Sequence, residues 1–254
     1  MVVKKMPSNN NSSKKAEHKA GDSHGMPEVS IYKYSCRGKT ILHEATIIAA
    51  FPMFLTIQNG KPIQVEKINE ARRILIPPVM EEYAYDPYEF SNMQEVESYF
   101  NEAQKESYDS LLQSAKSIVA KYNDQDEHKV ALVAIDIVWS YFQDKFSTTH
   151  YLGVIGDNGS GKSSIGDTFE AMGYRSVNMT DPTSANLFRL LGKIEAGQCT
   201  IVCDEADKID QSQDIMSTLK TGYQIKGKVA RVNMNTGKQE FFWTYCYKMI
   251  IAEK

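Results

Sequence analysis

A glycine-rich segment carries the residue types that bind nucleotide phosphates. Residues 156–163 read Gly-Asp-Asn-Gly-Ser-Gly-Lys-Ser, which fits the pattern of a glycine, four residues, and then Gly-Lys-Ser. The segment follows the apolar run 151–155 and precedes a helix-compatible stretch that ends near Met172. Glycines let the backbone wrap closely, so that successive N–H groups and the helix N-terminus point at phosphate oxygens. The pattern predicts a phosphate-binding loop between a strand and a helix.

Individual residues of this loop have distinct expected roles. We expect Lys162 to bridge the β- and γ-phosphates of ATP, and Ser163 to place its hydroxyl on Mg²⁺, a hard ion that takes oxygen ligands. The residues expected to contact the nucleotide are Gly156, Asp157, Asn158, Gly159, Ser160, Gly161, Lys162, Ser163 and Ser164. The less specific interpretation is a glycine-rich turn at a strand–helix junction that binds no ligand.

Two acidic residues further along the chain support the same chemistry. Asp204 and Glu205 directly follow the apolar run 199–203, which reads as a strand. Because open α/β sheets bind ligands at the carboxyl ends of their strands, we expect Asp204 to hold Mg²⁺ through a water. Glu205 is expected to orient and deprotonate the water that attacks the γ-phosphate. The predicted catalytic residues are therefore Lys162 and Glu205, and the predicted metal ligands are Ser163 and Asp204.

With these motifs the sequence resembles P-loop NTPases of the AAA+ type. The nearest resemblance is to primase-helicase proteins of plasmids, viruses and mobile elements, which are allied to the superfamily-three helicases, and it covers roughly residues 128–254. It implies ATP and Mg²⁺ as cofactors, assembly into a homo-oligomeric ring, and a site completed by a neighbour's arginine. It also implies a final core strand at 247–252 whose end carries a polar residue that senses the γ-phosphate. Since the chain stops before an arginine finger, we expect nucleotide binding with little turnover.

The stretch before that final strand carries the expected nucleic-acid contacts. Two strand-like runs, 227–232 and 241–245, flank a turn at 233–238, and residues 219–248 contain six basic side chains against one acid. In helicases of the resembled kind, a hairpin at this place grips the nucleic-acid backbone in the central channel. The candidate contacts to single-stranded DNA are Lys226, Lys228, Arg231 and Lys238. The alternative is an exposed hairpin with solvating lysines.

Three functions compete for these features. The leading hypothesis is the ATPase motor domain of a DNA helicase or primase-helicase in DNA replication. The first alternative is an ATP-gated regulatory or assembly ATPase that binds no nucleic acid. The second is a small-molecule kinase, which needs a basic lid, whereas no run of arginines follows the loop and Arg175 and Arg189 are isolated.

The elements that must position these residues follow from the pattern along the chain. We expect an α/β protein, with a P-loop NTPase core and parallel sheet preceded by helices and a small β-rich N-terminal domain. The predicted units are a disordered tail over 1–25, a β-rich domain over 26–80, an acidic linker with helices over 81–127, and the ATPase core over 128–254. Asn59-Gly60 predicts a hairpin turn, and Ser91 with Gln94 predicts a helix start.

Composition sets limits on these interpretations. The chain of 254 residues has 29 Lys and Arg against 32 Asp and Glu, a net charge of -3, so it is no polycation and any nucleic-acid contact must be local. Four cysteines are too few and too scattered for a disulfide framework. No stretch approaches the ~20 apolar residues that span a bilayer. These features indicate a cytoplasmic protein without a membrane segment.

Overall fold

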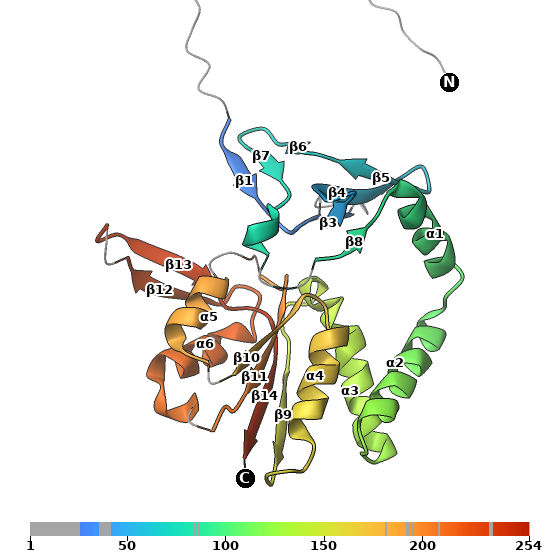
Figure 1. Cartoon of the computed structure of the whole chain (residues 1–254). Helices are drawn as coiled ribbons and strands as arrows, with labels where there is room; N and C mark the ends of the chain where they lie inside the picture. Colours follow the sequence, from blue (N-terminus) through green and yellow to red (C-terminus); the bar gives the residue numbers. More distant parts are fainter. Residues whose placement is uncertain are drawn as a thin grey trace, which may run out of the picture.

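A four-stranded parallel sheet carries the candidate residues. In the computed structural model its strands lie in the order β10-β11-β14-β9 (Figure 1). The strands are β9 (Tyr151–Gly156), β10 (Ser176–Thr180), β11 (Thr200–Asp204) and β14 (Tyr247–Glu253). The structure describes residues 26–35, 42–83, 85, 87–180, 182–191, 194, 196–207, 209–233 and 236–253. The predicted α/β class with a parallel sheet is confirmed.

The register of the sheet brings three strand ends to one edge. β14 pairs with β11 from Thr200↔Tyr247 onward, and with β9 as far as Gly156↔Glu253. Because every pairing is parallel, the carboxyl ends of β9, β11 and β14 lie at the same edge. β11 is buried except at its last residue, Asp204, as expected of a strand covered on both faces.

Helices cover both faces of the sheet. One face carries α2 (Tyr108–Tyr122), α3 (Glu127–Ser140) and α4 (Lys162–Met172), and the other carries α5 (Ser184–Leu191) and α6 (Gln213–Gly222) (Figure 1). Successive residues of β11 alternate between the two cores. Ile201 and Cys203 pack with the apolar residues of α5 and α6, whereas Val202 packs with those of α3 and α4. This alternation fixes α4, and the loop that precedes it, against the sheet.

A two-stranded hairpin extends from the sheet beside α5 (Figure 1). Its antiparallel strands, β12 (Lys228–Val232) and β13 (Gln239–Trp243), pair from Lys228↔Trp243 to Val232↔Gln239. The predicted hairpin is therefore present, with its strands within a few residues of the predicted runs. The hairpin is anchored at its base, where Val229 is buried and the Phe242 ring lies 5.8 Å from the Phe188 ring of α5.

Gly227 sets the attachment of this hairpin to α6. A Cβ atom at this position would overlap the carbonyl oxygen of Thr221 and lie 2.9 Å from that of Gln224, both of them backbone atoms. Gly227→Ala is therefore expected to lower the free energy of unfolding by about 3 kcal/mol. Denaturant unfolding with Gly153→Ala as the control measures this, because a Cβ at Gly153 meets nothing within 4 Å. Equal stability of the two variants would contradict this packing.

The N-terminal strands form two small sheets above the parallel sheet (Figure 1). One contains β2 (Lys33–Ser35), β3 (Leu42–Ile48), β4 (Phe51–Gln58), β5 (Lys61–Val65) and β8 (Glu89–Phe90), and the other contains β1 (Glu28–Ser30), β6 (Ile68–Asn69) and β7 (Ile74–Ile76). The predicted turn at Asn59-Gly60 connects β4 to β5. Both of its residues have positive φ, 52° and 75°, which suits a tight hairpin turn. The predicted tail over 1–25 lies outside the described residues.

The segment predicted as a linker is packed into the fold. Tyr85 is buried, and its ring lies within 5.5 Å of those of Tyr32 and Tyr83. β8 pairs in parallel with β3. The tyrosine- and acid-rich segment that was predicted as a linker thus contributes to the junction between the N-terminal strands and the sheet.

The helix start predicted at Ser91 is displaced by one residue. α1 (Met93–Ala103) is capped by Asn92, whose side chain accepts a hydrogen bond from Glu95 N at 3.1 Å. The Glu95 carboxylate in turn accepts from Ser91 N at 2.6 Å. Asn92 thus replaces Ser91 as the cap, because asparagine is an equally good cap, and Glu95 reaches back to the residue before the cap.

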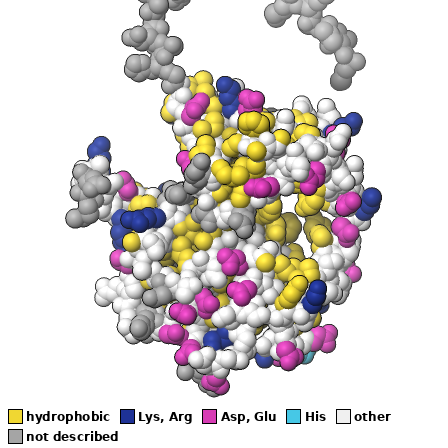
Figure 2. Space-filling model, in the orientation of Figure 1, with side chains coloured by type: hydrophobic (Ala, Val, Ile, Leu, Met, Phe, Trp, Pro, Cys, Tyr) yellow, Lys and Arg dark blue, Asp and Glu magenta, His cyan; other side chains and the backbone are white. Residues whose placement is uncertain are grey.

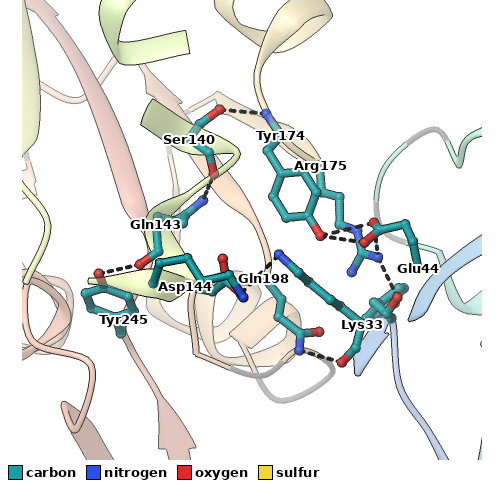
Figure 3. Close-up of polar contacts among 11 residues, drawn as sticks. Lys33, Glu44, Ser140, Gln143, Asp144, Tyr174, Arg175, Gln198 and Tyr245 are labelled. Atoms are coloured by element: carbon teal, nitrogen blue, oxygen red, sulfur yellow. Dashed lines mark hydrogen bonds and ion pairs between the residues drawn. The ribbon is translucent and has the colours of Figure 1, made fainter. Parts of the chain in front are cut away.

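Buried polar contacts attach the N-terminal strands to the sheet (Figure 3). Arg175 NH2 donates to Glu44 Oε1 on β3 and to the carbonyl oxygen of Tyr32, and the Tyr174 hydroxyl donates to Glu44 Oε1 at 3.0 Å. Lys33 Nζ lies 3.1 Å from Asp144 Oδ2. Because Tyr174 and Arg175 connect α4 to β10, the N-terminal strands are fixed to the far end of the helix that begins at the glycine-rich loop.

Candidate functional site

The glycine-rich loop connects β9 to α4 in the predicted order. β9 ends at Gly156 and α4 begins at Lys162, with Gly161 as its N-cap. Gly159 and Gly161 have φ of 75° and 82°, in the left-handed region where a side chain is strained. The glycines at these two positions are therefore required by the backbone, which turns back sharply to present the helix N-terminus.

The Lys162 side chain lies over its own loop. Its Nζ donates to the carbonyl oxygens of Gly156 at 2.9 Å and of Asp157 at 2.7 Å. Ser160 N donates to Asp157 O at 3.2 Å and closes the turn. The ammonium is thus held beside the concave side of the loop by two neutral acceptors.

The acidic pair lies at the carboxyl end of β11. Asp204 is the last residue of the strand, and its Oδ1 accepts a hydrogen bond from Glu205 N at 2.9 Å. Glu205 has φ of 52°, which is uncommon for a residue with a side chain and marks local backbone strain. Strain of this kind persists only where the surrounding structure imposes it, and it is concentrated at functional sites.

β14 ties this pair to the glycine-rich loop. Ala206 N donates to Ile251 O at 2.9 Å, and Glu253 N donates to Asp207 Oδ1. Since β14 also pairs with β9 up to Gly156, one strand fixes the position of both segments. The elements that carry the two motifs are separated in the sheet by β14 alone.

The two motifs line one cavity of about 670 Å³. From the loop it takes residues 158–164, and from β11 and the turn that follows it takes Asp204, Glu205 and Asp207. The structure therefore brings together the residues predicted for the nucleotide and metal site except Gly156 and Asp157, whose carbonyl oxygens accept from Lys162. Ser163 is exposed, whereas Ser164 also donates its hydroxyl to Tyr122 O at 2.9 Å and so contacts α2.

Three residues of this region were not predicted individually. Asp207 and Glu253 line the cavity, and Gln125 lies beside the loop, with its Nε2 4.0 Å from the place of a Cβ on Gly161. Glu253 stands where a polar residue was expected, at the end of the final strand. Asp207 lies three residues after Asp204, so it could have been predicted as part of the same acidic turn. Gln125 precedes α3, and no sequence pattern connects it with the glycine-rich loop.

Two cysteines near the site are structural. Cys199, directly before β11, and Cys203, within it, are buried free thiols. Burial raises the pKa of the Cys203 thiol to about 12, so this side chain is neutral behind the site.

The four predicted nucleic-acid contacts do not form one cluster. Lys228 Nζ lies 3.7 Å from the centre of the Trp243 ring, whereas Arg231 lies on the opposite face of the hairpin and pairs with Asp214 Oδ1 at 2.7 Å. Lys226 and Lys238 are exposed. Figure 2 shows basic side chains over the hairpin and acidic ones over the lower part of the molecule. The face that carries Lys228 also carries Phe241, which is 63% exposed.

The chain is similar to a solved structure, although its sequence matches no known family. No protein-family model matches the chain, and no curated protein matches it. Among solved structures, the chain is similar to the apo structure of the C-terminal region of NrS-1, residues 305–718, with 13% sequence identity and a TM-score of 0.38. The match covers 84% of this chain and 54% of that one, so the chain spans about half the length of that region. Within the described residues, every helix is too short or too polar to cross a membrane.

Proposed function

We propose that the chain binds MgATP in the cavity at the carboxyl edge of the sheet and is the motor domain of a DNA helicase or primase-helicase. The observation that carries this proposal is that a glycine-rich loop at a helix N-terminus and the Asp204–Glu205 pair line the same cavity. A cavity of about 670 Å³ falls in the range of small-molecule sites, and its residues carry the P-loop pattern.

In this proposal the loop binds the phosphates. The N–H groups at the start of α4 and the positive end of the helix dipole would face the phosphate oxygens, and Lys162 would exchange its two carbonyl acceptors for anionic ones. Ser163 and Asp204 supply the oxygen donors that suit Mg²⁺. Beside these two donors, the ion would take its other ligands from phosphate and water.

The same proposal assigns hydrolysis to Glu205. Its carboxylate is exposed beside the loop, and its backbone is held in an unusual conformation by the Asp204 contact. From that position it would accept a proton from the attacking water. A cationic group from a second copy of the chain in a ring would stabilise the transition state.

Asp204→Asn tests the metal part of this site. Without Mg²⁺, the variant is expected to bind ATP as tightly as the wild type does. The gain in ATP affinity on adding Mg²⁺ should be about tenfold smaller than in the wild type, because the neutral amide is a poor Mg²⁺ partner. Titration of a fluorescent ATP analogue with and without Mg²⁺ measures both quantities. Asp109→Asn, an exposed substitution in the first turn of α2, is the control. If Asp204→Asn kept the full magnesium effect, Asp204 would have no part in metal binding.

We propose that single-stranded DNA contacts the hairpin face formed by Lys228, Trp243 and Phe241. These side chains alternate along β12 and β13 onto one face, where an exposed ring can stack on a base and a lysine can neutralise a phosphate. Arg231 serves instead to hold the hairpin, since it pairs with Asp214 of α6 and lies 4.4 Å from the Phe188 ring of α5.

Phe241→Ala distinguishes the motor from an ATP-gated regulator. It is expected to weaken single-stranded DNA binding by about tenfold, the loss of one stacked base, and to leave ATP binding unchanged. Lys228→Glu should weaken DNA binding further, and the loss of affinity should be larger at lower salt concentration. Fluorescence anisotropy with labelled oligonucleotide measures the effect, and Phe51→Ala is the control because Phe51 is 67% exposed on β4. DNA binding that is absent, or equal in all variants, favours the regulator.

A further inference from the structure

A second cavity, of about 530 Å³, lies where the N-terminal strands meet the sheet. Its walls come from four places: Tyr85 and Tyr88 of the segment before α1, Tyr141 at the end of α3, Asp167 and Glu170 of α4, and the start of β10. None of these residues lines the candidate nucleotide cavity. The second cavity is therefore a separate feature, farther along α4 from the glycine-rich loop.

Buried polar atoms without partners gather at this cavity. Among the described residues, Arg175 Nε and NH1, the Tyr85 hydroxyl, Ser176 Oγ and Asn178 Oδ1 are buried and have no hydrogen-bond partner. The Arg175 side chain is fully buried. Unpaired buried polar atoms each cost about 1–3 kcal/mol, so proteins contain few of them, and their concentration in four lining residues needs an explanation. Most of these unpaired atoms can donate a hydrogen bond, and a carbonyl oxygen is a suitable acceptor for them.

The unpaired atoms lie along an open sheet edge. β10 is an outer strand and pairs only with β11 among the described strands. Because Arg175 O accepts from Thr200 N, alternate residues of β10 bond to β11, and the backbone groups of Ser176, Asn178 and Thr180 point outward. A third cavity, of about 390 Å³, continues the second along Val177–Thr180 and shares Val177 and Asn178 with it. Together they form a groove along the whole strand.

Acidic and aromatic side chains at one end of the groove favour the binding of a cation. Asp167 and Glu170 are exposed, one turn apart on α4, and neither forms an ion pair within the described chain. Tyr88 and Tyr141, which line the same cavity, are 38% and 41% exposed. Two free carboxylates beside two tyrosine rings bind a guanidinium or ammonium group by charge and by cation–π contact.

We propose that the β10 edge accepts an extended basic segment of a partner protein as an added strand. Backbone groups of the segment pair with the outward groups of Ser176, Asn178 and Thr180, and its arginine or lysine side chain enters the second cavity between Asp167, Glu170 and the tyrosines. Strand addition of this kind takes its affinity from main-chain hydrogen bonds and its specificity from side-chain pockets.

The test uses the full chain and a labelled peptide of about eight residues, long enough to cover β10 at roughly 3.3 Å per residue. The peptide alternates threonine and valine around a central arginine, and binding is followed by fluorescence anisotropy. Two matched peptides accompany it, one with citrulline in place of arginine and one N-methylated at alternate residues, and free L-arginine serves as a competitor. We expect saturable binding, about tenfold weaker with citrulline and lost with N-methylation.

Protein variants separate the two contacts. Asp167→Asn with Glu170→Gln should weaken the arginine peptide about tenfold and leave the citrulline peptide unchanged. Asn178→Pro removes an outward N–H that β11 does not use, so it should abolish binding, whereas Asn178→Ala keeps that N–H and should retain binding. Failure of the arginine peptide to bind, equal binding of the N-methylated peptide, or complete displacement by L-arginine would overturn the proposal. The peptide controls leave the protein unaltered and decide the outcome even if Asn178→Pro unfolds.

Discussion

Replacing Lys162 with alanine is expected to weaken MgATP binding about a hundredfold and to leave DNA binding intact. The side chain of Lys162 is the cation at the glycine-rich loop, where it is held by the carbonyl oxygens of Gly156 and Asp157. Charge-assisted hydrogen bonds to two phosphates contribute about 1.5 kcal/mol or more each. Since about 1.4 kcal/mol corresponds to a tenfold change in affinity, the loss of both gives about a hundredfold weaker binding. Titration with a fluorescent ATP analogue measures it directly.

Two controls make this result specific. Lys61→Ala removes an exposed lysine at the start of β5 and should bind ATP as the wild type does. Lys162→Met preserves the length of the side chain without its charge, and should behave like Lys162→Ala if phosphate attraction is the cause. Unchanged ATP binding by both Lys162 variants would remove the basis of the proposed nucleotide site. Loss of DNA binding together with ATP binding would instead indicate one shared site.

Arg175→Met is expected to lower the free energy of unfolding by about 3–5 kcal/mol. Its guanidinium is fully buried and pairs with Glu44, a carboxylate that is 18% exposed. Removing one partner of a buried pair leaves the other charge without compensation, which is far more costly than losing a surface pair. Arg175 also lies 5.1–5.4 Å from the rings of Tyr32, Tyr85 and Tyr174, so the variant loses cation–π contacts as well.

A double-mutant cycle separates these contributions. Glu44→Gln alone should also destabilise the protein, and the double variant should be more stable than the sum of the single effects predicts, because no unpaired charge remains. Arg73→Met is the control, since Arg73 and Glu70 form a pair that is 39% and 27% exposed and should contribute less than about 1 kcal/mol. Equal losses for Arg175→Met and Arg73→Met, measured by denaturant unfolding, would show that the Arg175 contact does not hold the N-terminal strands.

Local patterns in the sequence predicted the parts of this fold that depend on neighbouring residues. The strand, glycine-rich loop and helix around Lys162 follow from spacing along a single stretch, and so does the hairpin at Lys228–Trp243. The turn at Asn59-Gly60 likewise depends on two adjacent residues that tolerate positive φ. Sequence periodicity carries such information because the interactions it reflects are short in range.

Contacts between distant segments could not be predicted in this way. Arg175 has the polarity of a surface residue and was considered only as an isolated arginine, yet it pairs with Glu44, which is 131 positions away. The buried Lys248 is a similar case, with its ammonium held by the carbonyl oxygens of Thr244 and Cys246. The tyrosines near Tyr85 resembled a linker because their packing partners lie on other strands. A single sequence contains no signal for such partners.

The place of β14 in the sheet has a consequence for how the protein is made. The ribosome releases β9 long before β14, and β11 in between, but β9 has no other neighbour among the described strands. During synthesis the glycine-rich loop therefore emerges on a strand that cannot yet join a sheet, and its apolar residues remain exposed until β14 inserts between β9 and β11. Non-local pairing of this kind slows folding, and unpaired strands attract chaperones or other chains. Assembly of the site therefore waits for β14 and is completed by the insertion of this one central strand.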